Sequence, residues 1–297
     1  MGQFPFLNVP SPDGLLAKKS LERMSTMPDN PRSIAAVILA AGKGTRMQSD
    51  LPKVMHEVAD RPMLHWVVDA VRSDGLASAP VVLVVGYQRE LVEESFPERP
   101  DWLEFVVQAE QLGTGHAIDM ASPVFTDPAL RASTDVFVLC GDGPLIRTET
   151  LATLLERHRS TGAAATLATA RLEDPDGYGR IQRTATGGFD RIVEQKDASD
   201  EQRAINEVNP SYYVFKADAL FDRLSRLKND NASGEYYITD VFKLMQDDGL
   251  GVEVIDSVDP GDVLSINNPE QLAIVDSIMR ERLRHSEGTE VPQEGTA

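Results

Sequence analysis

The chain has 297 residues, 41% of them hydrophobic and 26% charged, which is enough for a substantial buried core. Its 47 acidic and 29 basic side chains give a net charge of -18, which repels nucleic acid and anionic membrane surfaces. Cys140 is the single cysteine, so the sequence excludes an intramolecular disulfide and a cysteine metal cluster. No run approaches the length of a membrane-spanning helix, and the first residues lack a signal-peptide pattern. We therefore expect a cytoplasmic protein without nucleic-acid or membrane partners.

The two ends of the chain lack the hydrophobic periodicity of the segment between them. Residues 1–33 contain many prolines, and residues 286–297 are polar and acidic. Such segments bury too little apolar surface to fold, so we expect a mobile N-terminal extension over 1–33 and a disordered acidic tail over 286–297. One folded domain is expected over residues 34–285.

The first half of this domain alternates strand and helix patterns. Short apolar runs are typical of strands buried on both faces of a parallel sheet. These runs are AAVILAA, PVVLVVG, EFVVQ and DVFVLCGD. Apolar residues recur at helical spacing over 62–73 and 148–159, which predicts crossover helices between strands. The pattern therefore predicts an α/β fold.

The second half has a different texture. From residue 163 onward, strand candidates are separated by turn residues. The candidates are AAATLATA, GYGRIQR, GFDRIVEQ and VNPSYYVFK. Helical patterns return near residues 217, 239 and 269. We therefore predict a second half with a mixed sheet.

The run LAAGKGTRMQSDLPK follows the first predicted strand. Backbone NH groups at Gly42 and Gly44 can approach phosphate oxygens, and Arg46 and Lys53 add the positive charge that this acidic chain must supply locally. Met47 stands where a dinucleotide-binding loop has its third glycine, and the Gly-Lys-Ser/Thr of a P-loop is missing. The run indicates another kind of phosphate-binding loop, with a solvated basic turn as the alternative.

Two polar segments are candidates for a metal site. Asp142 follows the buried run FVLC, so it is expected at the carboxyl edge of the sheet, where open α/β folds bind ligands. An aspartate there can bind Mg²⁺ or merely cap a turn. In INNPEQL, Asn268 before Pro269 and Glu270 has the pattern of a helix N-cap, which leaves Asn267 to face the site.

Several segments in order resemble the sugar-phosphate nucleotidyltransferase family. The resemblance is strongest to the uridylyltransferase domain of bacterial N-acetylglucosamine-1-phosphate uridylyltransferases, without their acetyltransferase β-helix domain, and it covers residues 35–276. The segments are LAAGKGTRMQSDLPK, QAEQLGTGHA, GDGPL, GYGRI, IVEQKDA, EVN, NASGEYYITD and INN. One such segment would be weak, whereas their order along the chain is specific.

The resemblance implies both a fold and a reaction. The fold would be a Rossmann-like nucleotide-diphospho-sugar transferase fold, with a mostly parallel mixed sheet flanked by helices, and residues 34–285 would form the nucleotidyltransferase domain. The reaction would be the Mg²⁺-dependent transfer of UMP from UTP to N-acetylglucosamine 1-phosphate, giving UDP-N-acetylglucosamine and pyrophosphate. The implied partners are these small molecules, and a homo-oligomer is left open.

The resemblance also assigns site residues. The nucleotide would bind at Leu39, Ala40, Gly42, Lys53, Gln108, Gln111, Gly113 and Thr114. The catalytic groups would be Arg46, Lys53 and Asp142. The amino sugar would bind at Gly179, Glu194 and Asn209, and Mg²⁺ at Asp142 and Asn267. A carboxamide carries both a donor and an acceptor, which suits the edge of uracil.

Other residues in these segments have simpler interpretations. We expect His116 to pack on its helix or lie at the surface, Tyr236 and Tyr237 to pack in the core, and Asp240 to begin a helix. Cys140 is interpreted as a small buried hydrophobic side chain, because no motif pairs it with a base.

The chain departs from the family pattern at a few positions. The family usually has Tyr at Cys140, Val at Gly143, Thr-Gly at Pro210 and Ser211, and Gly at Ser265. Most of these positions border the expected sugar site. The alternatives are therefore another sugar 1-phosphate such as glucose 1-phosphate, another nucleotide such as dTTP, or a catalytically silent nucleotide-sugar-binding regulatory protein.

Overall fold

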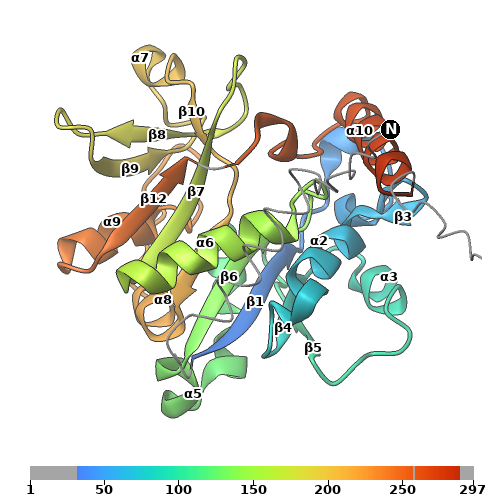
Figure 1. The fold of residues 1–297 in the computed structure, drawn as a ribbon, viewed down its shortest axis with the longest axis horizontal. Helices are drawn as coiled ribbons and strands as arrows, with labels where there is room; N and C mark the ends of the chain where they lie inside the picture. Colours follow the sequence, from blue (N-terminus) through green and yellow to red (C-terminus); the bar gives the residue numbers. More distant parts are fainter. Residues whose placement is uncertain (1–31, 257, 288–297) are drawn as a thin grey trace, which may run out of the picture. The chain divides into compact units, whose positions relative to one another are not determined.

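The computed structural model describes residues 32–256 and 258–287 of the chain (Figure 1). The first strand already begins at Ser33 and the last helix runs to Glu287. The rest of the extension expected over 1–33 and the rest of the tail expected over 286–297 lie outside the described residues. None of the helices within the described ranges is long and apolar enough to cross a membrane.

One large mixed sheet carries the domain. Its strands are β1 (Ser33–Ala40), β4 (Val81–Val85), β5 (Leu103–Val107), β6 (Thr134–Cys140), β7 (Ala165–Arg171), β8 (Gly179–Arg183), β9 (Phe189–Val193), β10 (Glu207–Asn209), β11 (Tyr213–Lys216) and β12 (Val252–Asp256). They lie in the order β5-β4-β1-β6-β11-β7-β10-β8-β9, with β12 paired to β7. A small separate ribbon pairs β2 (Glu57–Val58) with β3 (Arg61–Pro62).

The first half of the sheet is parallel. Strands β5, β4, β1 and β6 run in one direction, because helical crossovers connect them. Leu39 is in register with Val84 on one side and with Cys140 on the other. The carboxyl ends of these strands therefore meet at one edge, and the loops that follow them lie side by side there.

Helices cover both faces of this half, which explains its nearly continuous burial. Helices α2 and α6 pack together over one face (Figure 1), while α4, α8 and α9 join the hydrophobic core of the other. The helices are α2 (Met63–Arg72), α3 (Arg89–Glu94), α4 (Thr114–Asp119), α5 (Pro128–Ala132), α6 (Thr148–Thr161), α7 (Asp200–Arg203), α8 (Ala217–Leu224), α9 (Asp240–Asp247) and α10 (Pro269–Glu287). The helices predicted from spacing near residues 62, 148, 217, 239 and 269 are confirmed.

The second half of the sheet is mainly antiparallel, as expected for a mixed sheet. The prediction of one strand over VNPSYYVFK is wrong, because the run forms β10 and β11. Pro210 has no NH to donate to a ladder, and Ser211 has a left-handed φ of 65°. The break lets β10 and β11 pair with different neighbours, while both strands also pair with β7.

Candidate active site

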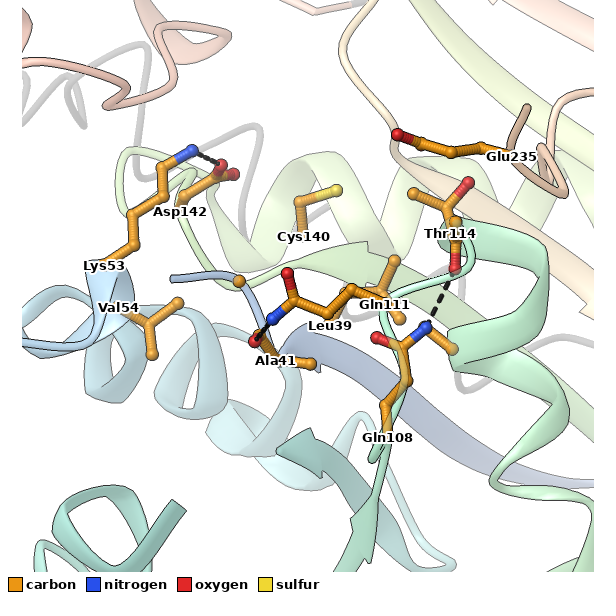
Figure 2. A pocket seen from close by; sticks show the side chains of 13 residues that line it. Leu39, Ala41, Lys53, Val54, Gln108, Gln111, Thr114, Cys140, Asp142 and Glu235 are labelled. Atoms are coloured by element: carbon orange, nitrogen blue, oxygen red, sulfur yellow. Dashed lines mark hydrogen bonds and ion pairs between the residues drawn. The ribbon is translucent and has the colours of Figure 1, made fainter. Parts of the chain in front are cut away.

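A pocket of about 300 Å³ opens at the carboxyl ends of β1, β5 and β6 (Figure 2). Figure 2 shows Lys53 and Asp142 at one end and Gln108, Thr114 and Glu235 at the other. The lining residues are Leu39, Ala41, Gly42, Lys53, Val54, Gln108, Gln111, Gly113, Thr114, Ala117, Cys140, Asp142 and Glu235. The structure thus brings most of the predicted nucleotide residues and the predicted aspartate to one cavity.

Ala40 is the predicted nucleotide residue that does not line this pocket. Its side chain is only 1% exposed, and Ala41 lines the cavity instead. Successive side chains of a strand point to opposite faces, so a shift of one residue decides which alanine meets the pocket.

The two glycines of the basic loop have different structural roles. A Cβ at Gly42 would meet no atom within 4 Å, so the backbone there is open to a ligand. Gly44 has a φ of +67°, and a Cβ there would lie 2.6 Å from the Cβ of Lys53. Glycine is therefore required at Gly44 for the loop to pack against the lysine stem, while at Gly42 it leaves space.

Glutamine side chains tie the far end of the pocket together. The Nε2 of Gln108 donates to the carbonyl oxygen of Gly113 over 3.0 Å and lies 3.1 Å from Nδ1 of His116. The Nε2 of Gln111 donates to the carbonyl oxygen of Ala41 over 2.7 Å, and this hydrogen bond joins the loop after β5 to the loop after β1 (Figure 2). Both amide nitrogens have partners within the protein, so the geometry of this end is held before any ligand binds.

The segment GEYYITD holds the glycine-containing loop by its backbone. Tyr236 exchanges backbone hydrogen bonds of 2.8 and 2.7 Å with Leu112 and Gly115. Gly113 has a φ of +113°, and a Cβ there would lie 2.6 Å from the carbonyl oxygen of Tyr236. Tyr236 packs against the core, as predicted. The neighbouring Glu235 lines the pocket, which the sequence did not indicate, because no spacing relates it to the other site residues.

At the charged end, three segments meet. The Nζ of Lys53 forms a salt bridge with Oδ2 of Asp142 and donates to Oδ1 of Asn267 over 2.8 Å. Arg46 donates from Nη2 to the same Oδ1 over 2.9 Å. The NH of Ile266 donates to the carbonyl oxygen of Asp142 over 3.0 Å, which joins the loop after β6 to the segment before α10. Arg46 and Asn267 thus lie beside the pocket without lining it.

The start of α10 has the predicted cap. Oδ1 of Asn268 accepts a hydrogen bond from the NH of Gln271 over 2.8 Å, and Pro269 is the first helical residue. The side chain of Asn267 is then free to turn toward Lys53. Its Nδ2 donates to Oγ of Ser265 over 3.3 Å, which directs Oδ1 to the basic side chains.

The donor set at this end fits Mg²⁺. Oδ2 of Asp142 and Oδ1 of Asn267 both contact the ammonium of Lys53. The two oxygens therefore converge on the point that this cation occupies. Mg²⁺ prefers such hard oxygen ligands and takes its remaining ligands from water and substrate phosphates. Within residues 32–256 and 258–287 no larger cluster of His, Cys, Asp or Glu could hold a metal.

The residues expected to bind the sugar lie outside this pocket. Gly179 and Asn209 are paired across β8 and β10. The buried Asn209 donates from Nδ2 to the hydroxyl of Tyr213 over 2.6 Å, and its Oδ1 accepts from the NH of Ser211 over 3.1 Å. Glu194 accepts from Oγ1 of Thr239 over 2.9 Å. In this arrangement the side chain of Asn209 supports the turn after β10.

One group in this region and one in the pocket have shifted pKa values. Burial raises the pKa of Glu194, and the nearby carboxylates of Asp240, Asp197 and Glu235 add to the rise against the hydrogen bond from Thr239. Burial also raises the pKa of Cys140 to about 12, so its thiol stays protonated at neutral pH. A protonated thiol is a poor nucleophile, as expected, but the prediction of a buried side chain is wrong, because Cys140 is partly exposed and lines the pocket.

Comparison with a solved structure agrees with the expected fold. A UDP-glucose pyrophosphorylase complexed with UDP-glucose superposes with a TM-score of 0.69, covering 84% of this chain and 99% of that chain at 18% identity. At this identity the likeness concerns the fold alone. The predicted nucleotide-diphospho-sugar transferase fold is confirmed, with a sheet that is parallel in its first half and flanked by helices.

Comparisons of sequence are more specific. The bifunctional protein GlmU of Pelobacter propionicus is 46% identical over 251 residues, which is 84% of this chain and 53% of that protein. GlmU of Geobacter sulfurreducens is 47% identical over 241 residues, which is 81% of this chain and 49% of that protein. The chain therefore spans about half the length of these curated relatives. The model of the MobA-like NTP transferase domain matches residues 36–243. The chain belongs to this family, and it is a nucleotidyltransferase.

Proposed function

We propose that the domain transfers UMP from UTP to N-acetylglucosamine 1-phosphate, with Mg²⁺, to give UDP-N-acetylglucosamine and pyrophosphate. The observation that carries this proposal is the pocket itself. It combines a polar end, where Gln108, Gln111 and Gly113 can contact a base, with a charged end, where Lys53 and Asp142 can hold phosphates and a metal. The resemblance of the ordered segments to N-acetylglucosamine-1-phosphate uridylyltransferases supports the choice of uridine and of the amino sugar.

The chemistry needs little more than alignment and charge. The phosphate of the sugar is an anion at pH 7, so its oxygen attacks the α-phosphorus of UTP directly. The new phosphorus–oxygen bond forms as the bond to the β-phosphate oxygen breaks, and the electron pair leaves with pyrophosphate. Lys53 and Arg46 offset charge on the triphosphate and on the leaving group. Mg²⁺ held by Asp142 and Asn267 would neutralise further phosphate charge. No side chain has to remove a proton.

A second candidate substrate is glucose 1-phosphate. Cys140 and Gly143 are both smaller than the residues usual in the family, and a Cβ at Gly143 would have only the ring of Tyr212 and the carbonyl oxygen of Cys140 as neighbours. Cys140 lines the pocket and Gly143 follows Asp142, so a substrate that reaches this loop meets smaller side chains than the family pattern provides.

The test is pyrophosphate release from UTP and Mg²⁺ by the full chain. N-acetylglucosamine, glucosamine, glucose and N-acetylgalactosamine 1-phosphates are compared, and dTTP is tried in place of UTP. We expect the highest kcat/KM with UTP and N-acetylglucosamine 1-phosphate. A higher value with glucose 1-phosphate or dTTP would replace the proposed substrate, and no release with any pair would support a silent binding protein.

A further inference from the structure

The ammonium of Lys53 lies where the two metal-binding oxygens converge. It contacts Oδ2 of Asp142 and Oδ1 of Asn267 at once, and Figure 2 shows its side chain reaching to the aspartate at the end of the pocket. The side chains of Lys53 and Asp142 are only 14% and 21% exposed. Water therefore screens little of the charge between them.

The stem of this lysine has little freedom. Lys53 begins a short 3₁₀ helix after Pro52, and the backbone of Gly44 packs against its Cβ. The ammonium can change position only by rotation of its outer torsions. Arg46 is a second cation that donates to Oδ1 of Asn267. Within the described part of the chain, it forms no hydrogen bond or salt bridge with Asp142.

We propose that Lys53 competes with the divalent cation for the oxygens of Asp142 and Asn267, and that the nucleotide triphosphate relieves this competition by offering the ammonium another anion. A divalent cation bound to both oxygens would lie within contact distance of the ammonium, and its double charge repels the ammonium more strongly than the guanidinium of Arg46 does, which shares only Oδ1 of Asn267 with Lys53. The metal therefore gains its ligands only when Lys53 turns away. The pocket that holds the nucleotide begins beside the ammonium, so the triphosphate is the anion within reach.

The inference rests on the proposed function for the identity of that anion, and it predicts a linkage. By reciprocity, whatever draws Lys53 away from Asp142 raises the affinity for the metal, and the metal raises the affinity for the nucleotide. The free protein then binds the divalent cation weakly, and metal and nucleotide bind together. Lys53 thus keeps the two metal-binding oxygens in place until substrate arrives.

The test measures binding of Mn²⁺ to the full chain without nucleotide, by electron paramagnetic resonance. Lys53→Met keeps the length of the side chain and removes its charge. We expect this variant to bind Mn²⁺ at least tenfold more tightly than the wild type, and Lys53→Arg to show no such gain. Arg46→Met is the matched control, since it removes a cation that contacts Asn267 alone, and its affinity should change less than threefold. Adding Asp142→Asn to Lys53→Met should abolish the gain.

The outcomes separate this inference from the proposed function. Equal or weaker Mn²⁺ binding by Lys53→Met overturns the inference, even where the wild type releases pyrophosphate. Tighter binding supports it, even where no sugar phosphate is turned over. Circular dichroism melts establish that each variant is folded, and Lys53→Gln replaces Lys53→Met in the same comparison if that variant is unfolded.

Discussion

Replacement of Gly44 by alanine separates a packing defect in the loop from simple backbone strain. Gly44 and Gly75 have nearly the same left-handed φ, +67° and +69°. A Cβ at Gly75 would meet nothing within 4 Å, whereas one at Gly44 would lie 2.6 Å from the Cβ of Lys53. Both alanines carry the cost of a left-handed residue, about 1–2 kcal/mol. Only Gly44→Ala must also move the lysine stem.

The expected result follows from this difference. For a domain of this size, 1 kcal/mol shifts Tm by about 2–4 °C, so each variant should melt several degrees below the wild type. Gly75→Ala should keep its turnover. Gly44→Ala should lose on the order of 10²-fold in kcat, because a displacement of about 1 Å at a group that aligns reacting atoms has that effect.

Two measurements check the reasoning. Thermal melts compare the stability of the variants, and pyrophosphate release gives kcat and KM with UTP and the best sugar 1-phosphate. Wild-type turnover by Gly44→Ala would refute the claim that this glycine positions Lys53. Equal loss of turnover in Gly75→Ala would also refute it, since the effect would then arise from stability alone.

Other variants test the metal ligands and a buried charge far from the pocket. Asp142→Asn should lower kcat by about 10²–10³-fold with a smaller change in KM for UTP, since it removes charge at the phosphates and leaves the base contacts intact; near wild-type turnover would contradict the site. Ser265→Ala should raise the Mg²⁺ concentration needed for half-maximal rate by a few fold, because Asn267 loses the partner that orients its amide; an unchanged Mg²⁺ dependence would exclude that orienting role. Burial of Asp135 opposes its ionisation, but the adjacent His158 ring and the guanidinium of Arg32, whose Nε donates to the carboxylate over 2.5 Å, outweigh this and lower its pKa to about 2. The folded pKa lies below the unfolded value of 3.8, so stability of about 2 kcal/mol should be lost as the pH falls from 4 to 2. Urea unfolding across this range should show a shallower pH dependence for Asp135→Asn.

Local patterns predicted the elements of the first half well. Runs such as AAVILAA and DVFVLCGD are buried on both faces, so their composition differs from that of their surroundings. The cap at Asn268 could also be predicted, because a cap depends on residues within one helical turn. The second half was harder, since the break between β10 and β11 depends on the backbone at Pro210 and Ser211.

Parts of the candidate site could also be predicted from the sequence. The resemblance of the ordered segments, from the glycine loop to INN, to a known family was enough to predict nucleotidyl transfer. The place of Asp142 after a buried strand also followed from the sequence alone.

What the sequence alone determined is therefore the succession of strands and helices, the family, and the residue types available to a phosphate and a metal. Only the tertiary structure decided which of them meet. Ala41 replaces Ala40 in the pocket because of the strand pleat, Glu235 enters it from the segment before α9, and Lys53 joins Asp142 to Asn267. These contacts join segments far apart in the chain, and their geometry is set by packing of the whole sheet, which no local pattern encodes.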